Sequence, residues 1–207
     1  MFNLERLIQE LIKLPDETPW LEFKHNNYDP EMIGKDISAL ANAATMHEKN
    51  CAYMIWGVHD KTHEIVGTAH NLQNLKKGNQ ELENWLRSLL SNNADFEFLK
   101  VEIENKNIGV LIIYNAVSFP VRFEKTDYIR IGSYTKKLKD YPTVESQLWD
   151  KIKNIKFEEQ WAKTDLDLNV AMGMLDCGVY QCAYSHAGNY WGSTERKKEC
   201  ISRTCYT

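Results

Sequence analysis

The 207-residue sequence lacks long apolar runs, has few glycines and prolines, and carries no excess of basic charge. No stretch approaches the roughly 18 consecutive apolar residues that a membrane-spanning helix needs. The first residues do not form a basic region followed by an apolar one, so we expect neither a membrane protein nor a secreted one. Of the five cysteines, only Cys51 lies outside the last 31 residues, and this sparse use favours a reducing, cytoplasmic compartment.

Motifs of several enzyme classes are also absent. The sequence contains no Walker-type or Rossmann-type glycine pattern and no serine in a nucleophile elbow. The net charge is −4, so any binding of nucleic acid must depend on a local basic patch. With 43% hydrophobic and 26% charged residues, a wholly disordered chain is excluded. The length allows one domain, or one domain with a tail.

The pattern of apolar residues predicts an α+β domain. Helical spacing indicates helices over residues 3–14, 30–44, 82–90 and 144–155, the second of them capped by Asp29. Strands are predicted at residues 20–24, 52–58, 64–67, 96–103, 108–114, 121–123 and 128–131. Because residues 52–58 are apolar on both faces, they are expected to form a central strand covered on both sides. We therefore predict a mixed sheet with hairpins, packed by helices.

The predicted α+β domain is expected to span residues 1–165. The character of the chain changes after that boundary. Residues 166–180 retain enough apolar spacing for one short helix, and from Gln181 onward we expect a poorly ordered tail that contains cysteines. Cys177 and Cys182 form one pair and Cys200 and Cys205 another, each with four residues between its cysteines and no knuckle glycines. We therefore do not favour zinc as a cofactor there.

Three acidic residues lie where a sheet can bring them together. Glu17 is in a predicted loop, Glu22 in a predicted strand, and Asp60 just after the buried strand. Carboxylates at strand ends can hold a hard divalent cation such as Mg²⁺ or Mn²⁺, and Lys24, on the same strand face as Glu22, can contact a phosphate. In the simpler interpretation, Glu22 and Lys24 form a solvated pair and Asp60 is a turn residue. Spacing alone favours the simpler interpretation.

Several segments, in order, resemble the Schlafen AlbA-type family, also known as the second AlbA family. The matching stretches are residues 17–24, 33–44 (IGKDISALANAA), 55–60 (IWGVHD), 65–68 (IVGT) and 128–134 (YIRIGSY). The resemblance covers about residues 10–160 and implies a nucleic-acid-binding domain. In bacteria and archaea, domains of this family often form the N-terminal module of longer proteins described as transcriptional regulators or ATP-binding proteins.

The resemblance also implies a catalytic site. Nuclease members among the animal Schlafens use three acids, a lysine and a divalent metal to cut RNA. By position, the acids and metal ligands fall on Glu17, Glu22 and Asp60, and the lysine falls on Lys24. The implied activity is that of an endoribonuclease dependent on Mg²⁺ or Mn²⁺. Animal nucleases build their RNA groove from two related lobes, whereas this chain has one, so a single copy would need to form a homodimer or bind RNA with half a groove. The alternative is a non-catalytic dimerisation or scaffold module of a truncated ATP-binding regulator.

Residues 120–139 form a local basic segment with a charge balance of +4, from six basic and two acidic residues. Tyrosines are interleaved with the basic residues, as expected of a surface that follows phosphates and stacks on bases. An ordinary solvated hairpin has the same composition, and Arg130 could equally pair with one of the acids. The residues predicted to contact DNA or RNA are Arg122, Lys125, Arg130, Tyr134, Lys136, Lys137 and Lys139.

Overall fold

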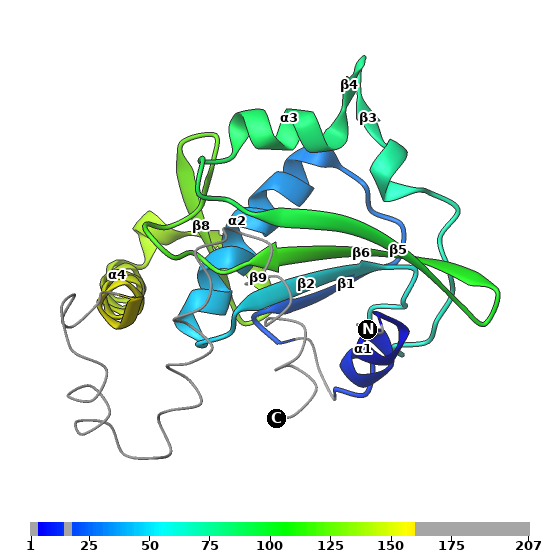
Figure 1. The fold of residues 1–207 in the computed structure, drawn as a ribbon, viewed down its shortest axis with the longest axis horizontal. Coiled ribbons are helices and arrows are strands. Elements are labelled where there is room, and N and C mark those ends of the chain that lie inside the picture. Colours follow the sequence, from blue (N-terminus) through cyan, green and yellow to red (C-terminus); the bar gives the residue numbers. More distant parts are fainter. Residues whose placement is uncertain (1–3, 15–17, 160–207) are drawn as a thin grey trace, which may run out of the picture. The chain divides into compact units, whose positions relative to one another are not determined.

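A four-stranded mixed sheet forms the centre of the α+β fold in the computed structural model, which describes residues 4–14 and 18–159 (Figure 1). The strand order is β1 (Leu21–Lys24), β2 (Cys51–Trp56), β6 (Lys106–Tyr114) and β5 (Phe96–Ile103). β1 and β2 are parallel, and the other pairs are antiparallel. Every residue of β2 is buried, which confirms the prediction of a central strand covered on both faces.

Helix α2 (Pro30–Met46) connects the two parallel strands. It begins where the sequence predicts, because the Asp29 carboxylate accepts a hydrogen bond of 2.9 Å from the Glu31 amide and proline occupies the first turn. Apolar residues such as Ile37 and Leu40 are fully buried in the core of the domain. The helix thus crosses between neighbouring strands and buries an apolar face.

Polar side chains of α2 are also buried, and they bind a distant part of the chain. The Asn42 amide donates hydrogen bonds to the carbonyls of Val121 (2.9 Å) and Tyr128 (2.8 Å), and its oxygen accepts one from the Val121 amide (2.8 Å). Ser38 donates to the Val121 carbonyl and accepts from the Tyr128 amide. These bonds satisfy backbone groups of the segment around Val121 that would otherwise be buried without a partner.

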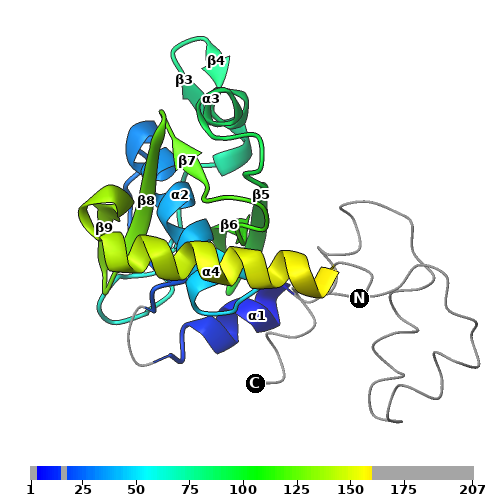
Figure 2. The ribbon, with the colours of Figure 1, turned by 90° about the vertical axis from the view of Figure 1, so that its left-hand side faces the viewer.

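The segment bound by α2 forms a second, three-stranded antiparallel sheet. It comprises β7 (Arg122–Phe123), β8 (Thr126–Ile131) and β9 (Tyr134–Lys137), followed by η2 (Leu138–Asp140) and α4 (Pro142–Glu159). Helix α2 contacts β8 along its length, and Figure 2 shows the two elements side by side. Hereafter, "basic segment" means residues 120–139. Because α2 contacts β8, the basic segment is attached to the core through this helix.

The remaining elements are α1 (Leu4–Leu11), η1 (Leu72–Asn74), β3 (Lys76–Lys77), β4 (Gln80–Glu81) and α3 (Leu82–Leu89). The predicted helices in the regions of α2, α3 and α4 are confirmed, as is the hairpin of β5 and β6. The first helix is shorter than predicted, since residues 12–14 form turns. The hairpin of β3 and β4 and the strand β9 have no counterpart in the prediction.

The predicted strand at residues 64–67 is wrong, because only a single bridge, between Val58 and Ile65, forms there. The amides of Val66 and Gly67 both donate to the Gly57 carbonyl, and Gly67 has a φ of 81° that turns the chain away from a ladder. The predicted helix at 166–180, the tail from Gln181 and the four C-terminal cysteines lie outside the described residues. Within the described part, no helix has the length and apolar character to cross a membrane.

Candidate functional site

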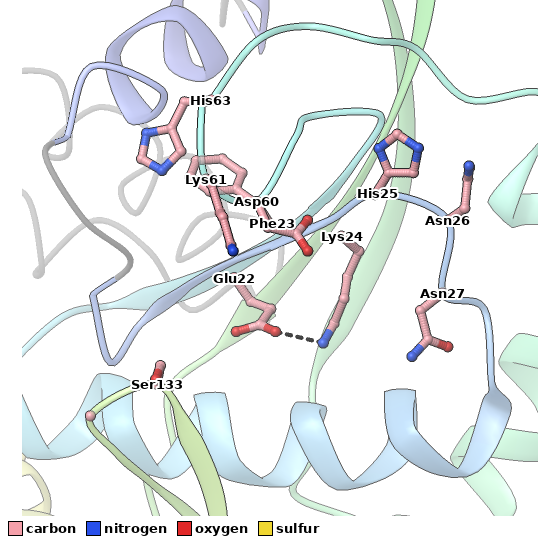
Figure 3. A pocket seen from close by; sticks show the side chains of 11 residues that line it. Glu22, Phe23, Lys24, His25, Asn26, Asn27, Asp60, Lys61, His63 and Ser133 are labelled. Carbon is pink, nitrogen blue, oxygen red and sulfur yellow. Dashed lines mark hydrogen bonds and ion pairs between the residues drawn. The ribbon is translucent and has the colours of Figure 1, made fainter.

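A pocket of about 770 Å³ lies at the carboxyl ends of β1 and β2 (Figure 3). Parallel neighbours end at the same edge of a sheet, so the chain after β1 and the loop after β2 meet there. The turn at Gly132 and Ser133, between β8 and β9, completes the wall. Three predicted catalytic residues, Glu22, Lys24 and Asp60, line this pocket. The fourth, Glu17, lies outside the described residues.

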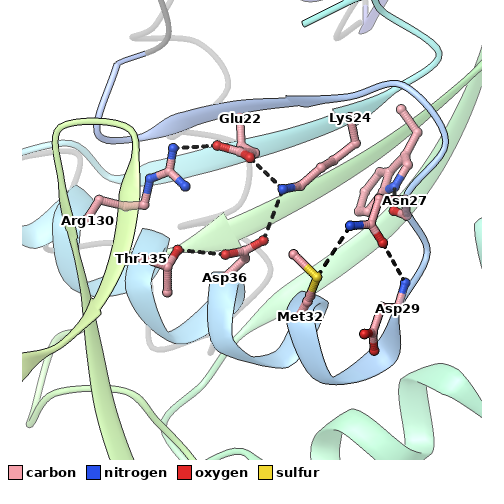
Figure 4. Close-up of polar contacts among 9 residues, drawn as sticks. Glu22, Lys24, Asn27, Asp29, Met32, Asp36, Arg130 and Thr135 are labelled. Carbon is pink, nitrogen blue, oxygen red and sulfur yellow. Dashed lines mark hydrogen bonds and ion pairs between the residues drawn. The ribbon is translucent and has the colours of Figure 1, made fainter.

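A network of charged side chains connects β1 with α2, β8 and β9 (Figure 4). Glu22 binds two cations: its Oε1 lies 2.5 Å from Lys24 Nζ, and its Oε2 accepts a hydrogen bond from Arg130 Nη2. Lys24 Nζ also lies 3.4 Å from Asp36 Oδ2, and the Thr135 hydroxyl donates to Asp36 Oδ1 at 2.7 Å. Hereafter, "ion network" means these five residues.

The ion network is buried and its formal charges cancel. The side chain of Arg130 is 2% exposed, that of Glu22 10% and that of Asp36 6%. Charges at such depth persist only when they are paired, and here two carboxylates meet two cations. Burial lowers the pKa of Lys24, but the carboxylates of Asp36 and Glu22 outweigh that effect and hold the pKa above its usual value. Lys24 is therefore a fixed cation at neutral pH.

Metal binding at the pocket lacks a complete donor set among the described residues. Within residues 4–14 and 18–159, no group of three or more His, Cys, Asp or Glu side chains is placed to hold a metal ion. Both oxygens of Glu22 already have cationic partners, and Lys24 and Lys61 balance the charges of Glu22 and Asp60 in the pocket wall. A divalent cation thus meets no net negative charge from these four residues. The predicted magnesium or manganese site stays a prediction.

The basic segment divides into one buried arginine and a set of exposed residues. Arg130 belongs to the ion network, which is the alternative that the sequence left open. Arg122 is exposed, and its Nε lies 3.0 Å from Asp127 Oδ1. The other predicted contact residues are all exposed: Lys125, Tyr134, Lys136, Lys137 and Lys139. Four lysines and one tyrosine thus remain as the surface of the predicted interface.

Sequence reasoning missed Asp36 as a partner of Lys24. The signal was present, because Asp36 is an acid within the apolar stretch 33–44 of the predicted helix, where a charge needs a partner. Lys61, which lines the pocket, was missed as well, and a lysine in a turn carries no such signal. Of the nearby histidines, His25 and His59 place their rings 5.9 Å apart, and His63 packs against Phe23 with 4.7 Å between centroids.

Comparison with known proteins identifies the family. A sequence profile described as Schlafen, AlbA_2 matches residues 17–139, which is more than half of the chain. No curated protein matches. The solved structure of the DIP2311 protein from Corynebacterium diphtheriae is 13% identical, with a TM-score of 0.41 over 65% of this chain and 29% of that one. This chain thus spans less than a third of that protein. The profile match extends from just before β1 to η2, across the sheet, the ion network and the basic segment, and the chain belongs to the Schlafen AlbA_2 family.

Proposed function

We propose that this domain binds nucleic acid through the exposed lysines of the basic segment. Membership of the Schlafen AlbA_2 family supports a nucleic-acid-related role. The observation that carries the proposal is the division within the segment. Arg130 is anchored in the ion network, while Lys125, Lys136, Lys137 and Lys139 face solvent. A buried anchor and exposed cations are what a surface that binds phosphates needs.

The anchor gives the lysines a defined spacing. Thr135 binds Asp36, and Arg130, which pairs with Thr135 across the two strands, binds Glu22. The two-stranded ribbon of β8 and β9 is thus attached to α2 and to β1 through one pair of neighbouring residues. Asn42 adds two hydrogen bonds to backbone carbonyls of the segment. A ribbon held in this way presents its cations without a large loss of conformational freedom on binding.

The proposal is tested by fluorescence anisotropy with labelled single-stranded RNA and duplex DNA at several salt concentrations. Each lysine that contacts a phosphate adds about 1 to the slope of log affinity against log salt. We expect the Lys136→Gln/Lys137→Gln double variant to lose about 2 from that slope. A matched control, Lys13→Gln/Lys153→Gln, changes the net charge equally outside the basic segment and should retain the slope. Equal slopes for the two double variants, or affinity insensitive to salt in the unmodified protein, would contradict the proposal.

A second candidate function is metal-dependent RNA cleavage. The observation in its favour is that Glu22, Lys24 and Asp60 line one pocket. The engagement of both Glu22 oxygens by cations weighs against cleavage.

To test for this activity, transfer RNA is incubated with the protein and Mn²⁺, Mg²⁺ or EDTA and resolved on a denaturing gel. The informative variant is Asp60→Asn, because Asp60 is exposed and its loss should leave the fold intact. Cleavage that needs metal and disappears in this variant supports an enzyme, and intact RNA in every lane excludes this activity under those conditions.

A further inference from the structure

Tyr134 is the one exposed tyrosine among the residues that the structure describes. Its relative exposure is 68%, whereas the other five described tyrosines are buried or half-buried. The next most exposed large hydrophobic residues, Met32 and Phe119, reach only 42% and 41%. An aromatic ring left in water gains nothing from burial in the folded protein, so it is available to a ligand with a flat apolar face.

The backbone at Tyr134 is anchored through its neighbours in β8 and β9. Side chains alternate along β9, so Tyr134 and Lys136 share one face while Thr135 points to the other, where it binds Asp36. Lys136 Nζ lies over the Tyr134 ring, 5.4 Å from its centroid. Tyr134 pairs with Ile131 across a two-residue turn in which Gly132 has a φ of 60°. The ring is therefore held at the tip of an anchored ribbon, beside a cation.

We infer that Tyr134 and Lys136 form a stacking platform for an unpaired base, so that the domain prefers single-stranded nucleic acid to duplex. The inference rests on the proposed function and specifies its ligand. Every base has a π-face that can stack on tyrosine, but a duplex hides these faces between neighbouring base pairs. The exposed lysines nearby in the chain, Lys137 and Lys139, suit a polyanion rather than an apolar protein partner.

The platform is separate from the ion network. Thr135 marks the face of β9 that meets α2 and Asp36, and Tyr134 extends from the opposite face of the strand. Replacing the ring therefore leaves the bonds of Glu22, Lys24 and Arg130 in place. A change in nucleic-acid binding by such a variant reports on the ring itself.

The test compares Tyr134→Ala with the unmodified protein on a single-stranded oligonucleotide and on a duplex of the same sequence. Stacking of one base contributes about 1–3 kcal/mol, which corresponds to about a 5- to 150-fold loss of single-strand affinity. Duplex affinity should change by less than about 2-fold, since the lysines remain. Tyr134→Trp should retain single-strand affinity. Phe119→Ala, which removes another exposed ring outside the basic segment, is the matched control and should bind normally.

A 2-aminopurine base in the single strand gives a second measurement, because stacking on the ring changes its fluorescence. We expect the change on binding to the unmodified protein and not to Tyr134→Ala. An equal loss of affinity for single strand and duplex, or no loss for either, overturns the stacking platform and leaves the proposed function standing. Absence of binding by the unmodified protein to both oligonucleotides overturns the two together.

Discussion

Replacement of Glu22 by alanine tests whether the ion network stabilises the fold. The change leaves the guanidinium of Arg130, 2% exposed, and the ammonium of Lys24 without their shared carboxylate. Removal of one partner from a buried ion pair lowers the free energy of unfolding by about 3–5 kcal/mol. A domain of this size is stable by about 5–15 kcal/mol. The variant should therefore lose a large share of its stability, equivalent to about 6–20 °C in Tm.

The assay is urea unfolding followed by tryptophan fluorescence, on a double-mutant cycle. Arg130→Met alone removes the opposite partner, and the Glu22→Ala/Arg130→Met double variant removes both charges. We expect the double variant to be more stable than the sum of the single changes predicts, because no unpaired charge remains between these two positions. Glu83→Ala is the matched control: Glu83 pairs with Arg87 at 2.9 Å on the surface, where both side chains are more than 40% exposed.

The control variant should lose less than about 1 kcal/mol, as exposed ion pairs usually do. A loss of that same size for Glu22→Ala would refute the reasoning that the ion network is a buried structural unit. The result also bears on the catalytic candidate. If Glu22→Ala destabilises the fold as expected, unfolding alone would explain a loss of RNA cleavage in that variant. Asp60→Asn is then the variant that tests whether the pocket is catalytic.

Two further changes probe the same region. Burial lowers the pKa of Lys24, but the carboxylates of Asp36 and Glu22 raise it by more than burial lowers it. The pKa of Lys24 in the folded protein therefore exceeds the unfolded value of 10.5. Stability from Lys24 is complete below pH 10.5 and is lost as pH rises through the folded pKa. Urea unfolding measures the difference in the free energy of unfolding between the unmodified protein and Lys24→Met. This difference should be constant from about pH 7 to 9 and shrink above 10.5, and a difference that is unchanged at pH 11.5 contradicts the reasoning. Gly34→Ala puts a Cβ 2.2 Å from Phe123 Cε2 and should cost about 1–3 kcal/mol despite the better helix propensity of alanine. Stabilisation, measured as a raised Tm, would disprove this packing argument.

The parts of the fold that could be predicted from the sequence are those with strong local patterns. The continuous apolar run of β2, the capped start of α2 and the paired apolar segments of β5 and β6 each determine their own conformation. Residues 64–67 have the composition of a strand. They fail to form one because the amides of Val66 and Gly67 share a single carbonyl acceptor. That bond depends on the turn at Gly57, which no pattern within the four residues encodes.

The part of the candidate site that could be predicted comes from the strand β1 and from the turn after β2, where Asp60 lines the same pocket. Alternation places Glu22 and Lys24 on the same face of β1, and both side chains enter the ion network as that alternation implies. Their other partners lie elsewhere in the chain: Arg130 is 108 residues from Glu22, and Asp36 is on α2. Sequence spacing carries no information about contacts at such separations, so the burial of Arg130 was visible only in the structure.

The hydrogen bonds from α2 to the basic segment have a consequence for folding kinetics. The bond between Asn42 and Val121 joins residues 79 positions apart, and the bond between Ser38 and Tyr128 joins residues 90 positions apart. Contacts of such high sequence separation form only after a long loop has closed, which slows folding. The amides of Val121 and Tyr128 should exchange with solvent only through an opening whose free energy approaches that of global unfolding, in the same cooperative unit as α2. A peptide of residues 120–139 alone would carry the lysines without their spacing.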